Sequence, residues 1–127
     1  NPVSCAAALA VMDIMKRDDY AGKARHIGEV VMKRYKELQE KYPVIGDVRG
    51  LGAMIGIELV KDKETKEPAT ELTAKLIQNA IQKGLLLENC GTAGNVVRFL
   101  APLTMTDEQM EKGLEIFEAS LKEAMEA

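Results

Sequence analysis

The chain is organised around one segment, residues 90–104, which reads Cys-Gly-Thr-Ala-Gly-Asn-Val-Val-Arg-Phe-Leu-Ala-Pro-Leu-Thr. A glycine-containing turn leads into a short apolar strand, and Pro102 marks the exit. Arg98 is the cation within this strand. Because an unpaired buried charge costs several kcal/mol, the guanidinium must meet a carboxylate or stay at the surface. The segment therefore raises the question of whether that carboxylate belongs to the protein or to a substrate.

Length and charge narrow the class of protein. The 127 residues correspond to one domain or to part of a larger one, and 46% of them are hydrophobic, which is enough for a packed core. The 17 basic and 20 acidic residues are spread along the chain and give a net charge of −3. Without a basic block or aromatic platforms, we expect no binding to nucleic acid.

Hydropathy and cysteine content argue against further classes of protein, namely membrane-spanning, disulfide-stabilised and metal-binding proteins. No run of about 18 apolar residues is present, so we expect no membrane-spanning helix. No signal peptide opens the chain, and we expect a cytoplasmic protein. Cys5, Cys90 and the single histidine, His26, form neither a disulfide framework nor a metal-binding pattern. We expect His26 to lie at the surface.

The first helix is unusual for so small a domain. Residues 3–17 have helical character, and the first half is apolar on all sides, which is typical of a helix that is buried all round. The chain also begins at Asn1-Pro2 without an initiator methionine. We therefore expect an interdomain helix over 1–17 that packs against a larger, missing body. An alanine-rich helix that tolerates exposure is the alternative.

The remaining pattern predicts an α+β domain over residues 18–127. Helices are expected over 20–41, from 70 to the left-handed cap at Gly84, and after a capping box at 106–109. Strands are expected at 53–60, 85–87 and 96–100, whereas the glycines between 45 and 52 suggest sharp turns and close approach of the backbone. The predicted fold is a three- to four-stranded, mainly antiparallel sheet with helices on one face. The other face would lie toward the missing part.

Polar residues on the predicted strands have structural explanations as well as functional ones. Asp47 and Arg49 flank a turn, and we favour a local ion pair over a catalytic role. Glu58 lies on the more open face of its strand. A pairing of Arg98 with a carboxylate of the protein, such as Glu58, is the structural alternative to a substrate-binding role. No phosphate-binding loop, nucleophile or carboxylate pair is recognisable. From the residues alone, the sequence predicts an α+β domain with one arginine of interest and one unpartnered helix.

Several motifs, in order, give the chain a family resemblance. They are Asn-Pro-Val-Ser-Cys at 1–5, Gly-Asp-Val-Arg-Gly-Leu-Gly-Ala-Met at 46–54, Gly-Leu-Leu-Leu at 84–87, Cys-Gly at 90–91, Gly-Asn-Val-Val-Arg-Phe-Leu at 94–100 and Pro-Leu-Thr at 102–104. Together they resemble the C-terminal portion of the class III aminotransferases, and most of all the 4-aminobutyrate aminotransferases. One departure is Ala101, where members often carry a proline. The resemblance covers essentially the whole chain.

The resemblance implies a fold type I enzyme with pyridoxal phosphate in a large domain at a homodimer interface. The chain would be the C-terminal small domain and the helix that enters it. The Schiff-base lysine and the threonine that contacts the cofactor phosphate lie upstream in the family. We therefore expect no catalytic, cofactor-binding or metal-binding residue in this chain. Arg98 matches the family arginine that binds the substrate carboxylate, so it is the expected substrate-binding residue.

The resemblance also implies an activity for the full-length protein. An ω-amino acid, with 4-aminobutyrate as the expected donor, would transfer its amino group to 2-oxoglutarate, and the isolated chain would be inactive. Acetylornithine, ornithine or another diamine is the alternative donor. A non-enzymatic alternative is a separate α+β module that binds a small carboxylate or another protein. The expected partners are amino-acid and 2-oxo-acid substrates, the missing large domain and a second copy of the chain.

Overall fold

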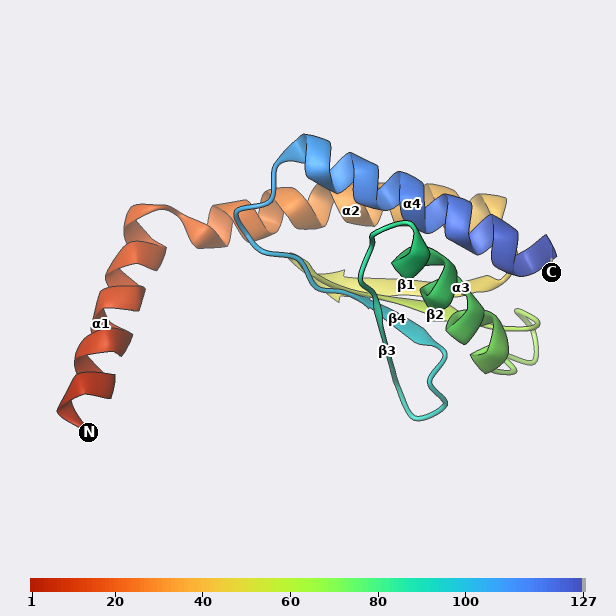
Figure 1. Cartoon of the computed structure of the whole chain (residues 1–127), viewed down its shortest axis with the longest axis horizontal. Helices are drawn as coiled ribbons and strands as arrows, with labels where there is room; N and C mark the ends of the chain where they lie inside the picture. Colours follow the sequence, from red (N-terminus) through yellow and green to blue (C-terminus); the bar gives the residue numbers. More distant parts are fainter. Residues whose placement is uncertain (127) are drawn as a thin grey trace.

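A computed structural model describes residues 1–126 as four helices and four strands (Figure 1). The helices are α1 (Pro2–Arg17), α2 (Tyr20–Lys41), α3 (Thr70–Gln82) and α4 (Asp107–Glu126). The strands are β1 (Ile45–Leu51), β2 (Met54–Leu59), β3 (Glu88–Cys90) and β4 (Val96–Phe99). The predicted α+β class is confirmed.

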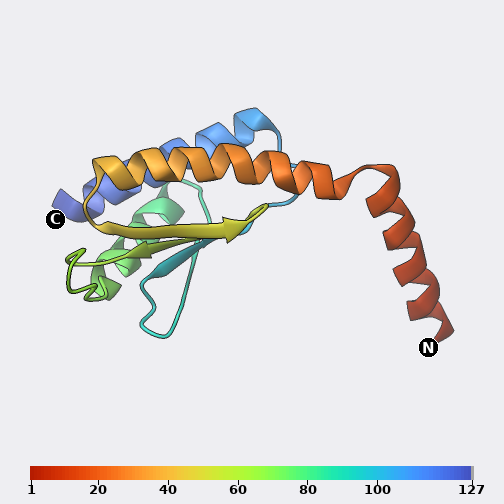
Figure 2. The ribbon, with the colours of Figure 1, turned by 180° about the vertical axis from the view of Figure 1, so that it is seen from behind.

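The four strands form one antiparallel sheet in the order β1-β2-β4-β3. Helices α2 and α4 run side by side over this sheet, and α3 packs against α4 and the sheet (Figures 1 and 2). Apolar residues on one face of the sheet are buried against these helices, and Tyr35 and Phe117 meet edge to face with ring centroids 4.9 Å apart. The helices therefore cover one face and leave the other, the open face, bare.

The long helices form where the periodic apolar pattern predicts them. The stripe on α2 is buried at Ile27, Val31, Tyr35 and Leu38, and Asp19 caps the helix by accepting a hydrogen bond from the Gly22 backbone N–H at 3.0 Å. The expected capping box before α4 is also present. Thr106 Oγ1 accepts from the Gln109 N–H at 3.2 Å, and Gln109 Oε1 accepts from the Thr106 N–H at 3.1 Å.

The expectations about the strands are correct only in part. Residues 45–51 form strand β1 and not a series of turns, whereas the close approach expected of the glycines is confirmed at Gly50, which lies against β2. A Cβ at Gly50 would lie 2.3 Å from the Met54 carbonyl oxygen, and the turn itself is at Gly52, whose φ is +53°. Residues 85–87 are not a strand either, because the segment that pairs with β4 is Glu88–Cys90.

Helix α1 extends away from the rest of the molecule (Figures 1 and 2). None of its residues is buried, although Val3, Leu9, Val11, Met12, Ile14 and Met15 are large and apolar. The described part of the chain therefore does not cover the apolar surface of this helix. Within residues 1–126, no helix has the length and apolarity needed to cross a membrane.

Candidate functional site

The open face of the sheet carries a row of four residues, one from each strand. Strand register places Arg49 of β1 opposite Gly56 of β2, Gly56 opposite Arg98 of β4, and Arg98 opposite Glu88 of β3. Because side chains alternate along a strand, the neighbouring Ile57 and Val97 point into the core and are fully buried. Two arginines therefore lie on one exposed surface, separated by a residue without a side chain.

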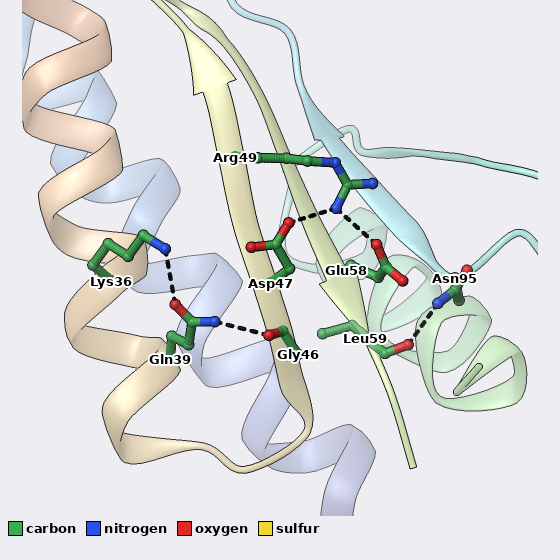
Figure 3. A network of polar contacts seen from close by, with 8 residues as sticks. All are labelled: Lys36, Gln39, Gly46, Asp47, Arg49, Glu58, Leu59 and Asn95. Carbon is green, nitrogen blue, oxygen red and sulfur yellow. Dashed lines mark hydrogen bonds and ion pairs between the residues drawn. The ribbon is translucent and has the colours of Figure 1, made fainter. Parts of the chain in front are cut away.

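Arg49 is held by two carboxylates of the protein. Its Nη1 donates to Asp47 Oδ2 at 2.8 Å and to Glu58 Oε2 at 2.7 Å (Figure 3). The hydrogen bonds to Asp47 and Glu58 raise the pKa of Arg49. Since Asp47 and Glu58 are direct partners across β1 and β2, the arginine offsets a repulsion between like charges. The expected structural ion pair of Asp47 and Arg49 is confirmed, with Glu58 as its third member.

Backbone-directed hydrogen bonds fix the strands on either side of this ion cluster. Gln39 of α2 donates to the Gly46 carbonyl at 3.0 Å, which attaches the start of β1 to the helix layer (Figure 3). Asn95 is buried and donates to the Leu59 carbonyl at 2.8 Å, which joins the beginning of β4 to the end of β2. The positions of Arg49 and Arg98 are therefore set by the sheet and not by loops.

Arg98 has a different environment from Arg49. Its Nη2 donates to Glu88 Oε2 at 2.7 Å, and the side chains are 42% and 68% exposed. In the described part of the chain, this is the one ion pair of Arg98, and it uses a single nitrogen. The alternative that Arg98 pairs with a carboxylate of the protein therefore agrees with the structure, but the partner is Glu88 and not the expected Glu58, which contacts Arg49. Arg98 therefore retains donors that face solvent.

The surroundings of Arg98 leave space for a ligand. A Cβ placed on the adjacent Gly56 would meet only Val96 Cγ1, at 3.3 Å, so the surface beside the guanidinium is flat. Arg98 also contributes to the lining of a cavity of about 230 Å³. The rest of that lining includes Tyr35 of α2 and Met110 of α4, so this cavity lies toward the helix layer. The space for a ligand beside the guanidinium is therefore the open surface over Gly56.

The chemistry available on the open face is the binding and orientation of an anion. None of the four strands contains a lysine, so none can offer an amine to a cofactor aldehyde. Among residues 1–126, no group of three histidine, cysteine or acidic residues is arranged to hold a metal ion. His26 is at the surface, as expected, with Nε2 2.8 Å from Asp107 Oδ1 and a side chain that is 55% exposed.

Glu88 is the residue of this face that the sequence interpretation missed. The local sequence around Glu88 is short and polar, and it does not by itself indicate a functional residue. The available signal was the hairpin, because counting outward from a turn at Gly91–Gly94 brings Glu88 opposite Arg98. The expected strand at 85–87 obscured this register.

The comparison with protein families identifies the chain. Residues 1–121 match the aminotransferase class-III family. The chain belongs to this family, in agreement with the resemblance seen in its motifs.

Individual relatives agree with this assignment. The chain is 47% identical over 116 residues to 5-aminovalerate aminotransferase DavT of Pseudomonas aeruginosa, covering 91% of this chain and 27% of the relative. It is 44% identical over 124 residues to 4-aminobutyrate aminotransferase GabT of Escherichia coli, covering 98% and 29%. Among solved structures, a Bacillus anthracis aminotransferase superposes with a TM-score of 0.88 at 28% identity, covering 97% of this chain and 28% of the other. The chain thus spans less than a third of the length of these proteins.

Proposed function

We propose that the full-length protein is an aminotransferase that moves an amino group from an ω-amino acid, 4-aminobutyrate or a close homologue, to 2-oxoglutarate. In this proposal, Arg98 binds the substrate carboxylate. Family membership and the similarity to 4-aminobutyrate and 5-aminovalerate aminotransferases support the reaction class. The observation that carries the role of Arg98 is its contrast with Arg49, which two protein carboxylates already hold.

The geometry of a guanidinium explains how Arg98 would act. Its planar fork presents parallel N–H groups that match the two oxygens of a carboxylate. Glutamate and 2-oxoglutarate carry such a group beside the carbon at which the amino group is exchanged. Because Arg98 is anchored on a strand, a bidentate contact would fix both the position and the direction of that carbon. Hydrogen bonds of this charged type contribute about 1.5–3 kcal/mol.

The cofactor belongs to another part of the protein in this proposal. Pyridoxal phosphate supplies the electron sink that amino-group transfer requires. The residues on the open face do not suit it, since they offer guanidinium and carboxylate groups but no lysine. We therefore assign the cofactor and its lysine to the portion of the protein that this chain does not span, and expect the isolated chain to be inactive.

The same proposal gives α1 a role as an interdomain helix, with residues 18–127 as a small domain. Its exposed apolar residues support this role, because they would be covered by the remaining portion of the protein. We also propose homodimer assembly, which the family resemblance supports, and a cytoplasmic location. Amide hydrogen exchange tests the helix. Exchange across residues 2–17 should be much slower in the full-length protein than in the isolated chain, and equal exchange in both would contradict the assignment.

Substitution of Arg98 in the full-length enzyme tests the substrate-binding role. Arg98→Ala should raise the apparent Michaelis constant for 2-oxoglutarate by about 10- to 100-fold, and Arg98→Lys should recover part of the loss because a point charge replaces the fork. Arg25→Ala removes an exposed arginine from the helix layer and serves as the control. An unchanged constant in both Arg98 variants would overturn the role.

The choice of donor needs a separate assay. Initial rates with 4-aminobutyrate, 5-aminovalerate, ornithine and acetylornithine, each with 2-oxoglutarate, would rank the amino donors. Formation of glutamate from one of the two ω-amino acids at the highest kcat/KM supports the proposal. A preference for ornithine or acetylornithine would show that one of these compounds, and not an ω-amino acid, is the amino donor. The absence of glutamate with all four compounds would overturn the proposed reaction.

A further inference from the structure

Three glycines lie within the strands of the sheet, and packing explains two of them. A Cβ on Gly46 would lie 2.8 Å from Val60 Cγ2. A Cβ on Gly50 would lie 2.3 Å from the Met54 carbonyl oxygen. Both positions are therefore too crowded for a side chain. Glycine inside a strand is otherwise unfavourable, because it loses more conformational entropy on folding than other residues, so the third glycine, Gly56 of β2, needs its own explanation.

Neither the backbone conformation nor crowding requires glycine at position 56. Its φ is not in the left-handed region, and the ladders to β1 and β4 are regular at this residue. Among residues 1–126, only Val96 Cγ1 lies within 4 Å of a Cβ placed on Gly56, at 3.3 Å. A shift of one methyl group by a few tenths of an ångström would relieve that contact. The fold would therefore accept a small side chain at this position.

A side chain at position 56 would stand between the two arginines of the open face. Arg49 and Arg98 are the direct partners of Gly56 on either side, and residues so paired have Cβ atoms about 4.5–5.5 Å apart. Neither arginine fills this place, since no atom of either lies within 4 Å of the Cβ position. The guanidinium of Arg49 is instead directed to Asp47 and Glu58 (Figure 3). The surface over Gly56 is thus open beside the donors of Arg98.

Resting on the proposed function, we propose that Gly56 is a specificity-determining residue, because the missing side chain provides the place where the substrate carboxylate lies when it binds Arg98. Glycine within a strand often marks the close approach of a ligand, and the two structural reasons for glycine are absent here. The carboxylate and the carbon next to it would lie directly on the backbone of β2. The size of residue 56 would then determine which carboxylates can reach the guanidinium.

This role predicts that stability and binding change in opposite directions. Alanine or valine at position 56 has less conformational entropy to lose than glycine, and valine is favoured in strands. The unfolding temperature of either variant should therefore equal or exceed that of the parent. Carboxylate binding should weaken as the side chain grows, because it takes the place of the ligand. A glycine with only a structural role would instead lose stability on substitution.

The experiment compares Gly56→Ala and Gly56→Val with the parent in the full-length enzyme. Gly56→Val should raise the Michaelis constant for 2-oxoglutarate by at least about tenfold, since even one misplaced methyl group in a binding site has an effect of this size. Gly56→Ala should give a smaller rise. The dissociation constant of glutarate, a dicarboxylate that lacks the reacting oxo group, should rise by the same factors in a calorimetric titration.

Three further variants serve as controls. Gly113→Ala adds a methyl group in α4, where a Cβ would meet only Leu85 Cδ1 at 3.7 Å, and it should leave both constants unchanged. Gly50→Ala introduces a methyl group at a crowded strand position and should lower the unfolding temperature. Arg49→Gln should change both constants less than about twofold. If Arg49→Gln reproduced the effect of Gly56→Val, position 56 would act through Arg49, and the inference would be overturned.

The inference and the proposed function fail in different ways. Unchanged binding in both Gly56 variants would overturn the inference, and if Gly56→Val folds poorly, Gly56→Ala alone decides. A lower unfolding temperature in both variants would also overturn it, since another part of the protein would then lie over Gly56. The substrate-binding role of Arg98 fails only if Arg98→Ala leaves the binding of 2-oxoglutarate and glutarate unchanged.

Discussion

Gly28 of α2 and Gly52 of the β1–β2 turn pack backbone against backbone. A Cβ on Gly28 would lie 2.4 Å from the Gly52 carbonyl oxygen, a distance that no relaxed contact reaches. This contact brings the helix layer directly onto the turn that joins the first two strands. The position of the turn, and with it the position of Arg49 on β1, therefore depends on a glycine in the interior of a helix. Glycine is otherwise unfavourable at such a place.

Gly28→Ala should destabilise the protein. The added methyl group meets backbone atoms that cannot move aside, and overpacking of this kind costs about 1–3 kcal/mol in the free energy of unfolding. Chemical denaturation measures the change. Gly113→Ala is the matched control, because a Cβ there would meet only Leu85 Cδ1 at 3.7 Å, and a helical glycine replaced by alanine gains up to about 1 kcal/mol. Equal effects at both positions would contradict the packing argument.

Arg49→Gln should affect stability and not substrate binding. Loss of the charge leaves Asp47 and Glu58 facing each other across β1 and β2, and we expect a loss of about 0.5–1 kcal/mol in the free energy of unfolding. The Michaelis constant for 2-oxoglutarate should change less than about twofold. A rise as large as that of Arg98→Ala would show that both arginines contact the substrate.

The helices, and the importance of Arg98 as a candidate site residue, could be predicted from the sequence because local patterns indicate both. An apolar stripe at helical spacing defines α2 and α4, and Thr106 and Gln109 define the start of α4. A cation within an apolar strand stands out by itself. These features depend on residues a few positions apart, and no distant segment is needed to interpret them.

The strand errors and the missed Glu88 arise from the pairing of one strand with another, which the pattern within a single segment does not show. Gly50 is consistent with a turn or with close approach when its segment is considered alone, and the pairing of β1 with β2 selects close approach. Residues 85–87 are apolar enough for a strand, but Leu85 and Leu87 instead pack against the core beside the helices. The partner of Arg98 depends on the register of two strands. Sequence patterns specify such register only weakly when a strand is three residues long.

Glu118 of α4 should give the protein a stability that depends on pH. Three side chains donate hydrogen bonds to this carboxylate: Lys41, Arg34 at 3.0 Å and Tyr42 at 3.0 Å. Arg34 and Lys41 lie on α2, and Tyr42 directly follows the helix. The hydrogen bond from Lys41, followed by that from Tyr42, lowers the pKa of Glu118 despite partial burial. A carboxyl group with a lowered folded-state pKa adds stability above its unfolded pKa. That contribution is lost as the pH falls through the folded-state pKa.

The test is Glu118→Gln, followed by denaturation between pH 7 and pH 3. At pH 7 we expect a loss of about 1–2 kcal/mol in the free energy of unfolding, and the difference from the parent should shrink below about pH 4. Glu123→Gln on the same helix removes a carboxylate whose one ion-pair partner among residues 1–126 is Lys83, and it should have a smaller effect. A difference independent of pH would show that Glu118 contributes by packing and not by its charge.

Thr106→Val should weaken the start of α4. The substitution keeps the shape of the side chain but removes the oxygen that accepts from the Gln109 N–H. Loss of such a cap costs about 1 kcal/mol, and the free energy of unfolding should fall by that amount. Thr106→Ser retains the hydroxyl and should behave like the parent. If the serine variant is as unstable as the valine variant, the cap does not determine the stability of this end.

The β3–β4 hairpin has a consequence for how variation in its turn would act. Because Glu88 faces Arg98 only in the present alignment, lengthening or shortening the 91–94 connection by one residue would bring Asn89 or Leu87 opposite the guanidinium. The charge next to Arg98 would then be gone without any substitution of Glu88 itself. The length of a surface turn thus determines which side chain is the electrostatic neighbour of Arg98. An insertion or deletion there would change that neighbour while leaving every charged residue in the sequence intact.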